Sequence, residues 1–160
     1  YFMSIFEKEF TRCKRYNNAM ALLLADVDHF KSINDTYGHF SGDQVLIAVS
    51  QTLGFSVRNH DTVARYGGEE FIILLPMSDT NVALAVSQRV RNSVQKMAFE
   101  SMPDRRVTIS IGVAVLEQGE YRSITEMVNA ADEALYTAKE SGRNCVALQS
   151  KSGIQVQARK

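Results

Sequence analysis

The sequence predicts an α+β fold in which helices pack on a central mixed or antiparallel sheet. Strand-like and helical segments alternate along the chain. A tight glycine turn joins two of the strand-like segments, and only antiparallel neighbours can be connected by so short a turn. A length of 160 residues fits one domain, and 45% hydrophobic residues supply one core. These observations exclude a disordered chain and a small disulfide-stapled scaffold.

The first half of the chain contains a helix, a buried strand and a further helical region. Residues 2–13 place apolar side chains at helical spacing, and residues 21–27 are almost wholly apolar, as in a central strand. We expect a short helix over 28–33 and a polar, glycine-bearing loop over 34–42. Asp43 would then cap or open the next helix.

The second half adds a hairpin, two helices and two strands. A Gly-Gly pair separates the strand-like segments 62–66 and 69–75, and glycine takes the positive φ that a tight hairpin turn requires. The later segments are a helix over 80–97, a strand over 107–116, a helix over 124–140 and a strand over 145–148. Residues 150–160 are polar and weakly patterned, so we expect a tail or linker after a domain of residues 1–149.

Charge and hydropathy exclude several functions. Eighteen basic residues balance eighteen acidic ones, so no bulk positive field attracts a nucleic acid polymer, and we expect no such partner. Cys13 and Cys145 lack metal-ligand spacing, so we expect two ordinary thiols in the reducing cytoplasm. No apolar run reaches the roughly 18 residues of a membrane span, so we expect no membrane contact by this segment.

The chain opens with Tyr1 instead of an initiator Met, and no cleavable signal pattern follows. We therefore expect an N-terminally truncated fragment. Its parent could be anchored to a membrane through the missing region.

Three acidic residues stand where strands of the expected sheet end or begin. Asp26 ends the central strand, and Glu69 and Glu70 follow the hairpin glycines. Neighbouring carboxylates repel one another, and a divalent cation such as Mg²⁺ relieves that repulsion. Taken singly, a strand-end Asp is usually a cap and a Glu pair beside a turn is usually solvated. In combination they indicate a metal site for phosphoryl transfer, with glycines that leave room for a nucleotide.

The residues around these acids resemble a known family. Arg65-Tyr66-Gly67-Gly68-Glu69-Glu70-Phe71 is similar to the GGDEF/GGEEF signature of bacterial diguanylate cyclases, and residues 26–35 (DVDHFKSIND) are similar to the family's upstream block. Further similar blocks are Gly38-His39 with Gly42-Asp43, Ser110-Ile111-Gly112-Val113, residues 131–136 (ADEALY), and Ala138-Lys139 with Gly142-Arg143-Asn144. The resemblance covers roughly the first 150 residues, and several ordered blocks exclude chance similarity.

The resemblance implies a fold like the catalytic palm of nucleotidyl cyclases and polymerases. It implies an enzyme that condenses two GTP into cyclic di-GMP and releases pyrophosphate. Each domain would hold one GTP, so catalysis implies a homodimer. The implied cofactor is Mg²⁺, with Mn²⁺ as an alternative, held by Asp26, the Val27 carbonyl, Glu69 and Glu70. Glu69 would help to deprotonate the ribose 3′-hydroxyl, and Lys31 would stabilise charge on the transferred phosphoryl group.

The resemblance also assigns residues to the substrate. The implied GTP contacts are Phe30, Lys31, Asn34, His39, Asp43, Lys139 and Arg143. The Asp43 carboxylate accepts the paired N–H donors of guanine, which favours GTP over ATP. The alternatives are a helix cap at Asp43, loop packing for His39, and cations near a helix C-terminus for Lys139 and Arg143.

Arg58-Asn59-His60-Asp61 resembles the family's RxxD inhibitory site, where the product binds, and Arg89 matches a further arginine of that site. Arginine forks bind guanine edges and phosphates well. The alternative is a surface Arg–Asp pair of little energetic consequence.

Two other functions stay open. The first is a non-catalytic GTP-binding or cyclic di-GMP receptor module, which the intact acids and lysines argue against. The second is a related cyclase with mixed purine selectivity, which Asp43 disfavours. The family's usual opening segment is absent before Tyr1, which puts in doubt the full activity of the fragment.

Overall fold

Four helices and six strands alternate along residues 1–160 of the computed structural model. In chain order they are α1 (Phe2–Tyr16), β1 (Met20–Val27), α2 (Phe30–Ser56), β2 (Thr62–Arg65), β3 (Glu70–Pro76), α3 (Thr80–Gln95), β4 (Ile109–Leu116), α4 (Ile124–Glu140), β5 (Val146–Ser150) and β6 (Gly153–Val156). One sheet holds the strands in the order β2-β3-β1-β4-β5-β6, and only β4 and β5 pair in parallel. The predicted mixed sheet with flanking helices is therefore confirmed.

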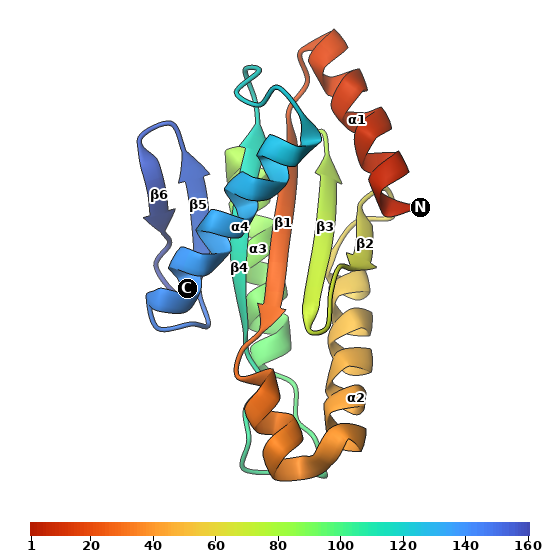
Figure 1. Cartoon of the computed structure of the whole chain (residues 1–160), viewed down its shortest axis with the longest axis vertical. Helices are drawn as coiled ribbons and strands as arrows, with labels where there is room; N and C mark the ends of the chain where they lie inside the picture. Colours follow the sequence, from red (N-terminus) through yellow and green to blue (C-terminus); the bar gives the residue numbers. More distant parts are fainter.

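The strand β1 lies at the centre of the sheet (Figure 1), and all eight of its residues are buried. Because strand side chains alternate between the two faces, β1 contributes to two cores. Ala21 and Leu23 belong to the core with α2 and α3, whereas Leu22 and Leu24 belong to the core with α1 and α4. Burial on both faces explains why the strand is apolar at every position before Asp26.

The predicted helix at the start of the chain is confirmed as α1, which buries Phe2, Phe6, Phe10 and Cys13. These side chains are 3 or 4 residues apart and therefore share one face of the helix.

None of the four helices combines the length and the apolar character that a membrane crossing needs.

The region after β1 differs from our expectation of a short helix, a loop over 34–42 and a new helix at Asp43. The helix α2 runs from Phe30 to Ser56 and leaves helical geometry only at Gly38, with φ 81° and ψ 161°. One glycine with positive φ is enough to bend the chain while the turns on both sides stay helical. Asp43 lies inside the second half of α2, so the expectation that it caps a helix is wrong.

The segment expected as a polar tail also contains regular structure. Residues 153–156 form β6, which pairs with β5 as an antiparallel hairpin at the edge of the sheet. Most β6 residues are exposed, so the strand carries little of the apolar pattern from which buried strands are recognised.

Gly112 sets the distance between α4 and β4. A Cβ at this position would overlap the Ala131 carbonyl oxygen and the Leu135 backbone nitrogen. The backbone of α4 therefore rests directly on the strand, across the near face of the sheet in Figure 1. This close approach brings the last turn of α4 to the end of the sheet where β1 finishes.

Replacing Gly112 with Ala is expected to lower the free energy of unfolding by about 2 kcal/mol or more, because the new methyl group meets backbone atoms that cannot rotate away. Gly54→Ala is the matched control. No atom lies within 4 Å of a Cβ at Gly54 in α2, so this change should raise stability by about 0.5–1 kcal/mol. Equilibrium urea unfolding measures both. A Gly112→Ala protein as stable as the parent would contradict the packing described.

Candidate active site

Asp26 and Glu70 stand opposite one another at the lower end of the sheet in Figure 1, where β1 finishes. They are partners in the antiparallel β1–β3 register, and opposite residues of such a pair point to the same face. Glu69 lies next to them on the hairpin turn, and its carbonyl oxygen accepts the Val27 N–H at 3.2 Å. The structure thus places Asp26 and Glu70 opposite one another, with Glu69 in the adjoining turn.

Lys139 supplies the positive charge nearest to Asp26. Its Nζ lies 2.7 Å from Asp26 Oδ2 and reaches the strand from the last turn of α4. Burial raises the pKa of the Asp26 carboxyl, Lys139 opposes that rise, and the charges of Glu69 and Glu70 add to it. Because like charges directly opposite destabilise a sheet, this end of β1 depends on a cation.

The oxygen atoms at this end suit a hard divalent cation. The carboxylates of Asp26, Glu69 and Glu70 and the Val27 carbonyl are ligands of the kind that Mg²⁺ takes. No three His, Cys, Asp or Glu side chains stand together at metal-ligand spacing, and Asp26 contacts Lys139 instead. The donor chemistry therefore fits the expected metal, while the carboxylates are not assembled into a closed cluster.

Arg65 holds the glycine turn of the hairpin. Its guanidinium donates to the Gly68 carbonyl oxygen from Nε at 3.0 Å and from Nη2 at 2.6 Å, and Nε also reaches the Gly67 oxygen at 3.2 Å. A Cβ at Gly67 would come within 2.7 Å of Glu70 Oε2. The predicted hairpin is confirmed, and Gly67 leaves the space in which the Glu70 carboxylate lies.

The bend at Gly38 brings the two halves of α2 into contact. Asn34, from the first half, lies against Gly42, where a Cβ would overlap Asn34 Oδ1. That oxygen is buried and has no hydrogen-bond partner. A buried amide oxygen without a donor is unfavourable, so Asn34 Oδ1 keeps an unused capacity to accept a hydrogen bond.

Asp43 follows Gly42 and lines a cavity of about 530 Å³ between α2 and the β2–β3 hairpin. Arg65 and Phe71 of the hairpin line the same cavity. Asn34 is not part of this lining, although it contacts the residue before Asp43. His39 is exposed beside the bend.

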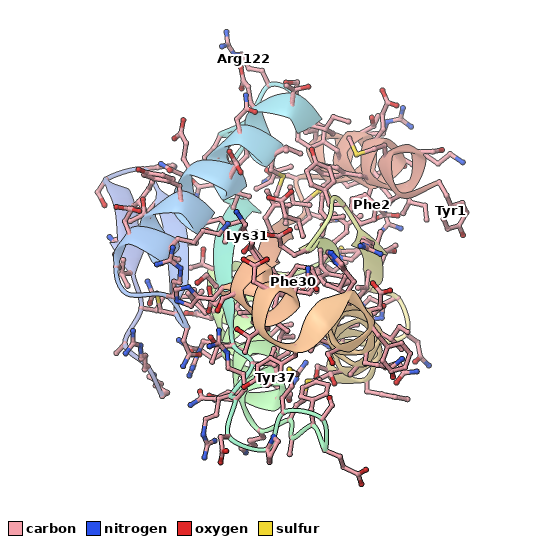
Figure 2. The ribbon with its side chains drawn as sticks, turned by 60° about the horizontal axis from the view of Figure 1, so that its bottom comes forward. Tyr1, Phe2, Phe30, Lys31, Tyr37 and Arg122 are labelled. Carbon is pink, nitrogen blue, oxygen red and sulfur yellow. The ribbon has the colours of Figure 1, made fainter.

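The N-terminus of α2 lies directly after β1. Figure 2 shows Phe30 and Lys31 in this first turn, in front of the sheet, and the Lys31 side chain is exposed. His29 precedes the turn with φ 55°, a left-handed conformation that costs a non-glycine residue about 1–2 kcal/mol. The strained residue reverses the chain and keeps the free N–H groups of the first helical turn near the end of β1.

Asp28 connects three parts of the site and was missed by the sequence analysis. This carboxylate is 4% exposed. Thr108 and Ser110 donate to it from their hydroxyls, each at 2.7 Å, and the Asn144 backbone N–H donates at 3.0 Å. Asp28 therefore ties the start of α2 to β4 and to the turn that carries Arg143. The sequence holds no signal for this network, since the partners lie 80 to 116 residues away.

Arg58 and Asp61 form a turn between α2 and β2. Asp61 Oδ2 accepts the backbone N–H of Arg58 at 2.7 Å, whereas Asp61 Oδ1 is buried without a hydrogen-bond partner. Arg89 of α3 donates to the Ser56 carbonyl oxygen at 2.9 Å and so lies beside the same turn. The Arg58 guanidinium is not paired with Asp61, so the alternative of a simple surface ion pair is not what the structure shows.

Known proteins share this fold and these motifs. The family model "Diguanylate cyclase, GGDEF domain" matches residues 1–145. The diguanylate cyclase DgcM of Escherichia coli strain K12 is 48% identical over 126 residues, which cover 79% of this chain and 30% of that protein. The chain thus belongs to the GGDEF domain family of diguanylate cyclases, and it spans about a third of the length of the curated relatives it matches.

Two solved structures show the same architecture. The active GGEEF domain of a diguanylate cyclase from Vibrio cholerae superimposes with a TM-score of 0.86 and 30% identity, over 92% of this chain and 94% of that chain. The GGDEF domain of DgcB from Caulobacter crescentus, in complex with c-di-GMP, has a TM-score of 0.84 and 32% identity, over 92% and 87% of the two chains.

Replacing Asp28 with Ala is expected to lower the free energy of unfolding by about 3 kcal/mol, because three buried donors lose their acceptor. Asp35→Ala, at an exposed position of α2, is the control and should change stability by less than about 0.5 kcal/mol. Guanidinium unfolding compares the two proteins. Equal stabilities would show that the Asp28 network does not hold these segments together.

Proposed function

We propose that this domain is a cytoplasmic diguanylate cyclase, which condenses two GTP into cyclic di-GMP across a homodimer and releases pyrophosphate. The observation that carries the proposal is the opposed pair of Asp26 and Glu70 beside a glycine turn that also bears Glu69. Membership of the GGDEF family supports the same reaction. The two free cysteines support a reducing compartment.

The residues that would hold Mg²⁺ or Mn²⁺ are Asp26, Val27 through its carbonyl, Glu69 and Glu70. When bound, the ion neutralises phosphate charge and polarises the reacting phosphoryl group. We assign Glu70 to metal binding, and its position directly opposite Asp26 supports that role. Glu69, on the turn beside them, is then the carboxylate that helps to remove the proton from the ribose 3′-hydroxyl.

Two such condensations close the ring: in each, the 3′-oxygen of one GTP bonds to the α-phosphorus of the other, and the bond from that phosphorus to the departing pyrophosphate breaks. Lys31 stabilises the negative charge on the transferred phosphoryl group, and the N–H groups at Phe30 and Lys31 bind phosphate at the helix N-terminus. Lys139 and Arg143 hold the triphosphate from the end of α4. The Lys139 ammonium also balances Asp26, as it does in the structure.

Asn34 and Asp43 recognise the guanine base. Guanine offers N1–H and N2–H donors side by side, which the Asp43 carboxylate accepts as a pair and adenine does not supply. The buried, unpaired Asn34 Oδ1 supports a ligand donor at this bend. His39, exposed at the same bend, contacts the base or the ribose.

Arg58, Asp61 and Arg89 bind cyclic di-GMP and inhibit the enzyme. The Arg58 guanidinium supports this assignment, because it forms no ion pair within the chain and keeps its hydrogen-bonding capacity for a ligand. Asp61 holds the turn through the Arg58 N–H, and its Oδ1 lies 3.8 Å from His60 Nε2. Arg89 adds a second guanidinium beside the same turn, and two arginine forks suit guanine edges and phosphates.

Incubation of the domain with GTP and Mg²⁺ should give cyclic di-GMP in an amount that rises more steeply than linearly with protein concentration. Glu69→Gln is expected to lower turnover by about 10³-fold and to leave the unfolding curve unchanged, because it removes the proton acceptor but keeps the shape of the side chain. Chromatography of the nucleotides, with pyrophosphate release followed in parallel, measures both effects.

Glu133→Gln, an exposed position on α4, is the control and should leave turnover unchanged. Full activity of the Glu69→Gln protein would remove Glu69 from the mechanism. A domain that binds cyclic di-GMP but makes no product at any protein concentration would be a receptor.

Arg58→Ala is expected to raise the cyclic di-GMP concentration that gives half-inhibition by about tenfold or more, because the ligand loses the hydrogen bonds of one guanidinium group. Turnover without inhibitor should stay the same. Product inhibition curves test this. Arg15→Ala on α1 serves as the charge-matched control. An inhibition curve that does not move would place the product site elsewhere.

A further inference from the structure

Arg91 of α3 is a buried cation that forms no ion pair with an Asp or Glu side chain. The residue is 2% exposed. Its guanidinium donates to the neutral side-chain oxygens of Gln88, Asn92, Gln95 and Asn144, at 2.7 to 3.1 Å, and to the Lys160 carbonyl oxygen at 3.1 Å. The four amide oxygens are neutral, so they satisfy hydrogen bonds of the guanidinium but do not cancel its charge. Burying a charge that no Asp or Glu side chain balances is unfavourable.

A cleft of about 460 Å³ lies next to this guanidinium. It is formed by the last turns of α3, the segment before β4, the α4–β5 turn and the C-terminal segment. Eight residues line it, and the five cations among them are Arg91, Lys96, Arg106, Arg159 and Lys160. The other three are amide side chains, so no acidic and no apolar residue contributes to the lining.

No Asp or Glu side chain neutralises the positive charge of this cleft. None of its five cations forms an ion pair with an Asp or Glu side chain, although the chain as a whole carries a formal net charge of +0. Burial lowers the pKa of Arg91, and the charge of Arg159 adds to that effect. Like charges gathered in one concave place without counter-charges are costly unless an anion joins them.

We infer that this cleft binds a compact oligophosphate, a chain of two or three phosphoryl groups without a base. Several guanidinium and ammonium groups converge on it, and such groups form the strongest hydrogen bonds with phosphate oxygens. A nucleobase or an acyl chain needs an apolar or aromatic wall, which this cleft does not have. The inference does not depend on the proposed cyclase reaction.

The cleft is separate from the candidate active site but is connected to it. None of the residues assigned to GTP or to the RxxD site lines the cleft. Asn144 belongs to both regions: its Oδ1 accepts from Arg91 at 2.9 Å, and its backbone N–H donates to Asp28 at 3.0 Å. An anion in the cleft would therefore act on the turn that carries Arg143.

Titration with inorganic pyrophosphate in the presence of EDTA tests the inference, followed by NMR of the arginine Nε–H groups and the backbone amides. We expect saturable shifts at Arg91, Arg106 and Asn144. The double variant K96Q/R106Q should weaken binding about tenfold or more, because it removes two exposed cations that make no hydrogen bond or ion pair within the protein. GTP titrated in the same buffer should not bind the cleft more tightly than inorganic tripolyphosphate.

The double variant K8Q/R15Q is the matched control, since it removes the same charge from exposed positions on α1. It should bind pyrophosphate as the parent does. If both double variants lost the same affinity for pyrophosphate, the loss would come from net charge alone, and the inference would be overturned. Shifts confined to Lys31, Lys139 and Arg143 would also overturn it, because they would place the anion in the candidate active site.

Discussion

The carboxylate of Asp26, buried at the end of a strand that is covered on both faces, is the charge on which the arrangement of this domain depends. Glu70 stands directly opposite, and burial together with the charges of Glu69 and Glu70 raises the pKa of the Asp26 carboxyl, so a cation nearby favours its ionised form. The fold supplies one, because α4 rests on Gly112 and brings Lys139 to within 2.7 Å of Asp26. Asp26 and Glu70 are also ligands proposed for the metal. The packing of α4 on Gly112 therefore determines both the position of Lys139 and the charge balance at the proposed metal site.

Backbone geometry positions several other residues of the site. The turn before Glu70 lacks Cβ atoms and is held by Arg65, and the bend at Gly38 folds α2 so that Asn34 meets Gly42. Asp28 then joins the start of α2 to β4 and to the α4–β5 turn.

Charge is balanced over the whole chain but separated within the fold. The acids gather at the end of β1, and unpaired cations gather beside Arg91 on the other side of the Asn144 turn. The amides around Arg91 keep its hydrogen bonds while leaving its charge uncompensated. Such a separation costs stability and is typical of sites that meet charged ligands.

The sequence by itself determined the mixed α+β fold, the buried central strand and the hairpin, because apolar periodicity and glycine turns are local signals. The tertiary structure alone decided that α2 continues through residues 34–42 with one bend, that β6 extends the sheet, and that Asp26 stands opposite Glu70. It also decided that Lys139 reaches Asp26 and that Asn144 contacts both Asp28 and Arg91. Those features rest on one backbone angle, on a mostly exposed edge strand and on side chains 53 to 116 residues apart, which no pattern within a single element records.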